Sequence, residues 1–374
     1  MTDQPGPIEP TSAVSGRGAL VVLLAVVGLA AGGCASTENA SGSREAGTSL
    51  AGPAAAASGL WESEVAPVPS PGCGSAATPS DAGVTDETLA HNGVDRDFTV
   101  FVPERDGGSP MPLLLDLHGL GSNKEQQRGL SGYEELARRD GVAVAWPQGL
   151  GERPGWDFGP NGANDDVGFM VELVAAIGES ACIDEARVYA SGMSNGGLLS
   201  SALACLHPET FAAVAPVAGY QVTADCGSPS SVILFYGTDD AVLPWAGGVG
   251  EGLGAVVKGE IPDLPPPEPP DMSADPGFLA PVPVNVNEWA TLAGCDPERT
   301  EDAVSTEVAH WVYDDCDDGA VEAYVVDGGG HSWPGSEALA DLSDPVISAV
   351  VGTTTFDISA TDLAWAFFAA HPRR

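Results

Sequence analysis

A serine framed by glycines constrains the fold of this chain more than any other feature. The pattern G-x-S-x-G is formed by Gly192-Met193-Ser194-Asn195-Gly196, after the short apolar and β-branched run 187–190 and before a helix-like segment. Small flanking residues let the backbone turn sharply and lift a serine hydroxyl clear of a sheet edge. The N–H of Asn195, at the start of the helix, would then face a developing oxyanion. The alternative is a glycine-rich turn with an incidental serine, because the chain contains 48 glycines.

Strand-like and helix-like runs alternate along the chain, which predicts an α/β fold with a mostly parallel sheet covered by helices on both faces. The expected strands are 97–102, 113–117, 142–146, 187–190, 211–218, 231–236, 307–313 and 321–326. The expected helices are 133–139, one opening at 165, 195–206, 285–293 and 356–371. Because the first strand alternates and ends at Pro103, we expect it to be antiparallel.

The charge of the chain excludes some partners. Fifty-three acidic residues against 14 basic ones give a formal net charge of -39, and the only lysines are Lys124 and Lys258. Such a surface repels nucleic acid and acidic membranes. The composition is typical of a halophilic protein kept soluble in high salt, and a generally acidic secreted protein is the alternative.

The N-terminal residues predict export. Residues 1–33 hold a single arginine, Arg17, and the apolar run 19–31, which is too short to span a bilayer comfortably and indicates a signal peptide. Ala31-Gly32-Gly33-Cys34 resembles a bacterial lipobox, in which the cysteine is lipidated. We expect a lipid anchor at Cys34 as the only membrane contact, with simple secretion as the alternative. Residues 34–72, rich in small residues and proline, predict a flexible tether before a domain at 73–374.

The cysteine count predicts disulfides. Apart from Cys34, an even set of six remains in an exported chain: Cys73, Cys182, Cys205, Cys226, Cys295 and Cys316. Six cysteines can form three disulfides in fifteen ways. No C-x-x-C occurs and the histidines are not clustered near cysteines, so we expect no zinc site.

An acid and a histidine follow late strands, where a serine nucleophile needs them. Asp239 and Asp240 follow the expected strand 231–236. His331 lies in a glycine-rich loop after the last expected strand, and no other histidine combines a late position, a loop after a strand and flexible flanks. The order Ser194, Asp, His331 is that of α/β-hydrolases.

A second glycine-rich turn predicts the rest of an oxyanion hole. His118-Gly119-Leu120-Gly121 follows a buried strand-like run, where open α/β sheets place their sites. H-G-x-G can aim the backbone N–H of Leu120 at an oxyanion, whereas we expect the His118 side chain to serve packing or the turn.

With these residues the sequence resembles the polyhydroxybutyrate-depolymerase-type esterase family, which includes secreted feruloyl and acetylxylan esterases of carbohydrate esterase family 1. The resemblance covers about residues 73–372. It rests on separated motifs: Leu117-His118-Gly119, Pro147-Gln148-Gly149, Asp165-Asp166-Val167-Gly168-Phe169, the segment 191–197 around Ser194, Gly237-Thr238-Asp239-Asp240, the segment 328–335 around His331, and Asp357-Ile358-Ser359-Ala360-Thr361.

The resemblance implies an α/β-hydrolase fold and a catalytic triad. Ser194 would be the nucleophile, His331 the base and Asp240 the acid, with Asp239 at a variable position. It also implies two disulfide pairs and leaves the third by elimination: Cys205 with Cys226, Cys295 with Cys316, and Cys73 with Cys182.

Substrate-binding residues are also implied by the resemblance. Trp156 and Trp333 align with aromatic positions near the active-site mouth, where a flat indole can support a polymer chain or a phenolic acyl group; loop anchoring is the alternative. Trp245, which stands where the family often has tyrosine, and the Pro/Gly-rich insertion 246–283 depart from the family pattern where specificity would be set. The insertion is either a lid or a solvated loop.

The function that these features predict is an exported serine esterase. It would hydrolyse carboxylic esters of a polymer or oligomer, such as a polyhydroxyalkanoate or a feruloylated or acetylated polysaccharide, through an acyl-enzyme. We expect a monomer that needs no metal or organic cofactor. A serine peptidase of the α/β-hydrolase type is a first alternative, disfavoured because no propeller-sized N-terminal domain is present. A catalytically inactive envelope-binding lipoprotein is a second, disfavoured because a binding module needs neither the serine, the acid nor the histidine.

Overall fold

A computed structural model describes residues 65–74, 83–104, 109–158, 164–248, 250, 280–317, 319–340, 342 and 345–374. The predicted signal peptide, Cys34, the tether up to residue 64 and most of the insertion 246–283 lie outside these residues. Within the described residues, no helix combines the length and the apolar character needed to cross a bilayer.

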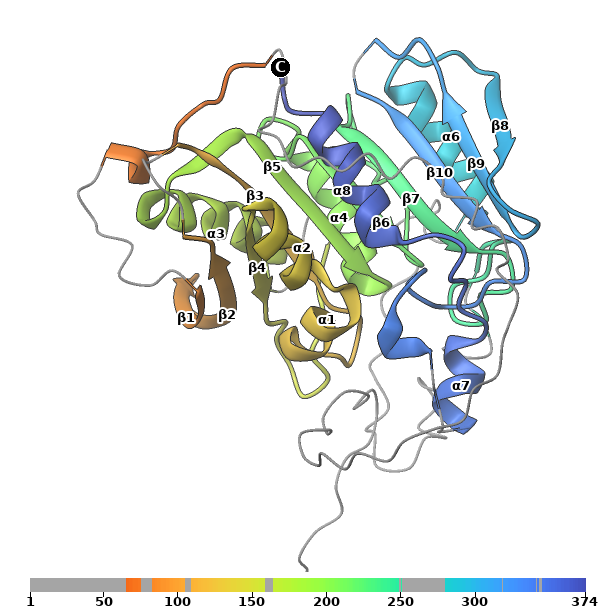
Figure 1. Ribbon diagram of the computed structural model, residues 1–374, viewed down its shortest axis with the longest axis horizontal. Coiled ribbons are helices and arrows are strands. Elements are labelled where there is room, and N and C mark those ends of the chain that lie inside the picture. The colour runs from red at the N-terminus through yellow and green to blue at the C-terminus, as the bar shows by residue number, and fades with distance from the viewer. Residues whose placement is uncertain are drawn as a thin grey trace, which may run out of the picture.

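One mixed sheet organises the described part of the chain (Figure 1). Its ten strands are β1 (Gly83–His91), β2 (Val94–Val102), β3 (Met111–Leu117), β4 (Ala143–Pro147), β5 (Ile183–Met193), β6 (Ala213–Val217), β7 (Ser231–Gly237), β8 (Arg299–Ala303), β9 (Val308–Tyr313) and β10 (Val321–Val326). Their order across the sheet is β1-β2-β4-β3-β5-β6-β7-β10-β9-β8.

The middle of the sheet is parallel and its two margins are antiparallel. Strands β4, β3, β5, β6, β7 and β10 pair in parallel, whereas β1, β2, β9 and β8 add antiparallel pairs. Every residue of β3 and β7 is buried, as expected for strands covered on both faces. This is the α/β-hydrolase architecture that the sequence predicts.

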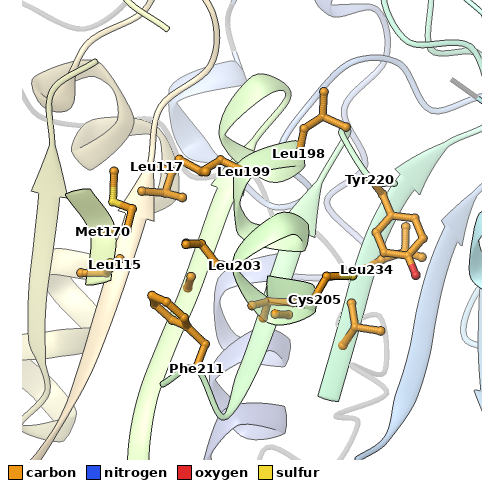
Figure 2. Packing of buried hydrophobic residues seen from close by; sticks show 14 of the residues in the cluster. Leu115, Leu117, Met170, Leu198, Leu199, Leu203, Cys205, Phe211, Tyr220 and Leu234 are labelled. Atoms are coloured by element: carbon orange, nitrogen blue, oxygen red, sulfur yellow. The ribbon is translucent and has the colours of Figure 1, made fainter. Parts of the chain in front are cut away.

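Helices cover both faces of the sheet. They are α1 (Lys124–Ser131), α2 (Tyr133–Asp140), α3 (Asp166–Ser180), α4 (Asn195–Leu206), α6 (Val282–Leu292), α7 (Pro345–Val351) and α8 (Ala360–Ala370), with short 3-10 turns η1 (Pro71–Gly74) and η2 (Glu337–Leu339). One apolar cluster joins α3, α4 and α6 to the sheet, and a second joins α2 and α8 to its other face. In the first, Leu199 and Leu203 of α4 pack with Leu115 and Leu117 of β3 (Figure 2).

Two strands and two helices were not predicted from the sequence: β1, β8, α1 and α7. β1 pairs with β2 through a tight hairpin whose turn residues Asn92 and Gly93 have φ values of 49° and 80°. An Asn-Gly pair with two positive φ angles is the commonest short hairpin turn. That dipeptide was the available signal for β1.

The three disulfides pair as the resemblance implies, joining Cys73 to Cys182, Cys205 to Cys226 and Cys295 to Cys316. The first bond joins the 3-10 turn η1, which contains Cys73, to Cys182, the residue just before β5.

The last residues of the predicted tether are bound to the domain. The N–H of Val68 donates to Asp184 Oδ1 at 2.8 Å, and Arg187 Nη2 donates to the carbonyl of Val65 at 2.9 Å. Ser70 N–H donates to the Ile183 carbonyl at 2.8 Å. The boundary predicted at residue 72 is therefore too late, because the buried carboxylate of Asp184 fixes this segment against β5.

Candidate active site

The predicted nucleophile turn forms between β5 and α4. Ser194 has φ 56° and ψ -119°, a strained conformation for a residue with a side chain. Side chains at Gly192 or Gly196 would overlap the backbone at Leu117, so the two glycines permit the close approach of this turn to β3. Ser194 itself is half-buried, and its N–H donates to the Val217 carbonyl at 2.8 Å. Ser194 therefore lies at the carboxyl end of β5.

His331 and Asp240 meet at that same end of the sheet. His331 Nδ1 lies 2.8 Å from Asp240 Oδ2, and both residues are buried. The other oxygen, Oδ1, accepts the N–H groups of Val242 and Leu243 at 2.8 Å each. Asp240 can therefore fix the orientation and tautomer of the imidazole, with Nδ1 donating and Nε2 left as the acceptor.

The order of the strands brings the three residues to one edge. Strands β5, β6, β7 and β10 are consecutive neighbours and run parallel, so their carboxyl ends share one edge. Ser194 follows β5, Asp240 follows β7 and His331 follows β10. Asp239, the other candidate acid, is exposed, and its N–H donates to the Gly329 carbonyl at 2.9 Å.

The glycines beside His331 provide close packing. A side chain on Gly330 would overlap the backbone at Val351, and one on Gly237 would overlap Gly329. Gly330 N–H also donates to the Thr353 carbonyl at 2.9 Å. The glycines expected from the sequence to be flexible flanks are therefore closely packed against neighbouring backbone.

The turn at His118 lies beside Ser194. A Cβ built on Gly119 would be 3.4 Å from Ser194 Cβ, and Leu120 is partly exposed next to it. His118 is fully buried; its Nδ1 lies 2.8 Å from the Gly119 carbonyl, and its Nε2 accepts the N–H of Gly149 at 2.9 Å. Burial lowers the pKa of His118 to about 4. The neutral ring thus holds the turn, which agrees with the structural role expected for its side chain.

Asn195 links the nucleophile turn to a neighbouring loop. Its Oδ1 accepts the N–H of Trp156 at 2.7 Å, and its Nδ2 donates to the Trp156 carbonyl at 3.1 Å. Asn195 is also the first residue of α4, so its backbone N–H lies at the positive end of that helix. The side-chain link to Trp156 was not foreseen from the sequence.

Both tryptophans expected to bind substrate are buried. Trp156 is 6% exposed, and its indole N–H donates to the His118 carbonyl at 2.7 Å. Trp333 is 1% exposed, and its indole N–H donates to Thr361 Oγ1 at 3.0 Å. These contacts correspond to the loop-anchoring alternative, because an enclosed indole offers no face to a substrate. We assign neither side chain to substrate binding.

A buried carboxyl group in β3 was missed in the sequence. Asp116 is fully buried and accepts hydrogen bonds from Ser131 Oγ at 2.5 Å, Gln127 Nε2 at 2.7 Å and Trp146 Nε1 at 2.9 Å. Burial raises the pKa of this carboxyl group to about 7, although the three hydrogen bonds act in the opposite direction. In the sequence it is a single acid in an otherwise apolar strand.

Asp116→Asn is expected to remove a pH-dependent loss of stability. The folded state binds the Asp116 proton more tightly than the unfolded chain does, since its pKa is about 7 instead of 3.8. As the pH rises from 5 to 8, the wild type should therefore lose about 2 to 3 kcal/mol of unfolding free energy relative to the variant. Denaturant titrations at each pH measure this difference.

The other ionisable groups near Asp116 do not produce this change. Burial keeps the pKa of Tyr133 on α2 far above its usual value, so that phenol stays neutral. Arg128 on α1, whose guanidinium lies 5.5 Å from the centroid of the Trp146 ring, carries a constant charge. A stability difference between wild type and variant that stays constant from pH 5 to 8 would contradict the prediction.

Comparisons with known proteins find esterases among the relatives of this chain. A family profile described as esterase PHB depolymerase matches residues 97–234, a range that includes His118 and Ser194. NocK of Nocardia uniformis subsp. tsuyamanensis, described as an esterase, is 31% identical over 272 residues, which cover 68% of this chain and 72% of NocK. Feruloyl esterase C of Emericella nidulans is 31% identical over 189 residues, covering 48% of this chain and 65% of that protein.

Further relatives are similar over different shares of their length. Feruloyl esterase B of Piromyces equi is 29% identical over 237 residues, covering 60% of this chain and 40% of that protein. Among solved structures, acetyl xylan esterase from Aspergillus awamori aligns with a TM-score of 0.47 and 16% identity, over 66% of this chain and 94% of that one. The match to NocK over most of both chains, together with the family profile across the serine turn, shows that this chain belongs to the polyhydroxybutyrate-depolymerase-type esterase family and is a carboxylic ester hydrolase.

Proposed function

We propose that this esterase works through a serine acyl-enzyme, with Ser194 as nucleophile, His331 as general base and Asp240 as the orienting acid. The observation that carries the proposal is the 2.8 Å contact between His331 Nδ1 and Asp240 Oδ2, at the sheet edge where Ser194 occupies its strained turn. Because Nδ1 is engaged by Asp240, Nε2 is the nitrogen that can take the serine proton.

The reaction then follows from the roles of these groups. Ser194 Oγ gives its proton to His331 and attacks the ester carbonyl, and the backbone N–H groups of Leu120 and Asn195 stabilise the oxyanion. The imidazolium, stabilised by Asp240, protonates the departing alcohol. Water, activated by the same imidazole, hydrolyses the acyl-enzyme and restores the serine.

The substrate we propose is an ester carried by a polymer or oligomer outside the cell. Relatives named feruloyl esterase B and feruloyl esterase C support a feruloylated polysaccharide. The family profile also allows a polyhydroxyalkanoate, and an acetylated polysaccharide is a further candidate. Three disulfides support an exported protein, because such bonds persist in oxidising surroundings. Attachment to the membrane through a lipid on Cys34 is part of this proposal.

A fluorophosphonate probe is expected to label Ser194 covalently. Such probes react with serines activated by a neighbouring base, so mass spectrometry of the labelled peptide should place the adduct on residue 194. The same preparation should hydrolyse p-nitrophenyl acetate, methyl ferulate and hydroxybutyrate oligomers at different rates. The ester that is hydrolysed fastest indicates the substrate class.

Two results would count against the proposal. An adduct on another residue, with hydrolysis unchanged after labelling, would remove Ser194 from the mechanism. A folded protein that neither reacts with the probe nor hydrolyses any of the esters would support the inactive binding lipoprotein.

A further inference from the structure

A continuous set of buried hydrogen bonds runs from β3 to the loop that carries His331. Ser131, at the end of α1, donates its hydroxyl to Asp116 Oδ2 at 2.5 Å. The carbonyl of the same Ser131 accepts the hydroxyl of Thr361 from the first turn of α8. Thr361 Oγ1 accepts in turn the indole N–H of Trp333 at 3.0 Å. Trp333 follows His331 by two residues.

Thr361 joins two partners in this set through a single hydroxyl. Its single O–H is donated to Ser131, so its lone pair is free to accept from Trp333. A methyl group in place of this hydroxyl would leave a buried carbonyl and a buried indole N–H without their partners. The loss of such partners is more costly than the loss of one exposed hydrogen bond.

The same buried cluster contacts the strand of the nucleophile. The ring of Trp333 packs edge-on against Tyr133, with 5.8 Å between centroids. Tyr133 donates its hydroxyl to Ser191 Oγ at 3.1 Å, and Ser191 donates to the Ala215 carbonyl at 2.8 Å. Ser191 lies on β5, three residues before Ser194. These contacts connect the loop that carries His331 with strand β5, which leads to Ser194.

We propose that Thr361, with Ser131 and Asp116 behind it, is a positioning residue that keeps His331 aligned with Ser194. None of the three touches a reacting atom, so their effect on catalysis would be transmitted by Trp333 and the closely packed His331 loop. The inference rests on the proposed roles of Ser194 and His331. A small displacement of a base from its nucleophile is enough to slow proton transfer strongly.

Thr361→Val is the direct test, because valine keeps the shape and removes only the hydroxyl. We expect kcat to fall about 10- to 100-fold, with KM changed by less than about twofold. Thr361→Ser restores the hydroxyl and should recover kcat to within about threefold of wild type. Thr99→Val is the matched control, since Thr99 is also buried and donates its hydroxyl to Asp86 on β1, at the antiparallel margin of the sheet.

A second readout does not depend on ester hydrolysis. The His331 Nδ1–H proton bonded to Asp240 should give a low-field proton NMR signal, assigned by its loss in His331→Ala. The signal should broaden or disappear in Thr361→Val and persist in Thr361→Ser and Thr99→Val. Trp333→Phe removes the indole N–H, the other partner of the bond to Thr361, and should have the same effect as Thr361→Val. The test therefore remains possible if one of the two variants does not fold.

Several outcomes would overturn the positioning role. One is a Thr361→Val protein that is less stable but keeps the wild-type kcat and the His331 signal. Others are a loss of kcat that serine does not reverse, or a loss equal to that of Thr99→Val. If instead wild type and Ser194→Ala hydrolyse esters equally, the proposed mechanism fails, and the NMR signal alone then decides whether Thr361 positions His331.

Discussion

Ser194→Ala is expected to lower kcat by about 10⁶-fold while changing KM little, which is the scale found when a triad serine is removed. The alanine keeps the turn between β5 and α4, because the strained backbone there is imposed by the close packing of Gly192 and Gly196 against Leu117. Substrate binding should therefore survive the change. Steady-state kinetics on the preferred ester measure both parameters.

The control for this prediction is Ser201→Ala. Ser201 lies on the same helix α4, is buried, and donates its hydroxyl to the Gly197 carbonyl at 3.0 Å. Loss of the Ser201 hydroxyl should cost stability but leave kcat within about twofold, because Ser201 lies about two helical turns beyond Ser194. Residual hydrolysis by Ser194→Ala above about one thousandth of the wild-type rate would show that another group supplies the nucleophile.

The parallel strands could be predicted because burial on both faces leaves a clear sequence signal. The apolar run 321–326 corresponds to β10 over the same residues, and the run 231–236 corresponds to β7 with one residue more. β8, with the sequence Arg-Thr-Glu-Asp-Ala, has no such signal, because it lies at the exposed edge of the sheet. α1 is similarly polar, and only Gln127 and Ser131 are buried in it.

Residues of the candidate site could be predicted where a local sequence pattern marks them. They could not be predicted where their role depends on contacts with residues far away in the sequence. Ser194 and His331 are set apart by local glycine-rich patterns. Asp116 was missed, because its three hydrogen-bond donors belong to residues 127, 131 and 146, and no local sequence pattern indicates these contacts. Trp333 was misassigned for the same reason: its partner Thr361 lies 28 residues further along the chain.

The two adjacent acids differ in burial and in their partners. The side chain of Asp240 is fully buried and bonds to His331 and to two backbone N–H groups, whereas Asp239 is exposed. The sequence alone placed both after the same strand, and only the resemblance favoured Asp240. Substitution of each acid by its amide therefore forms a matched pair, in which size is kept and charge is removed.

Asp240→Asn is expected to lower kcat by about 10⁴-fold, and Asp239→Asn by less than about twofold. An amide at position 240 still accepts the N–H groups of Val242 and Leu243 through its oxygen, so the loop should keep its shape. Its NH₂ group then faces His331 Nδ1 and selects the tautomer in which Nδ1 accepts. Nε2 consequently carries a proton and cannot take the one from Ser194 at neutral pH.

The pH dependence separates this explanation from a general loss of folding. Because the protonated Nε2 must lose its proton before it can act as a base, Asp240→Asn should regain part of its activity only at strongly alkaline pH, where hydroxide assists. Rates from pH 6 to 10, with thermal unfolding recorded for each variant, test this directly. If Asp239→Asn shows the large loss and Asp240→Asn does not, the acid of the triad is Asp239, and the buried pair with His331 serves only to hold the loop.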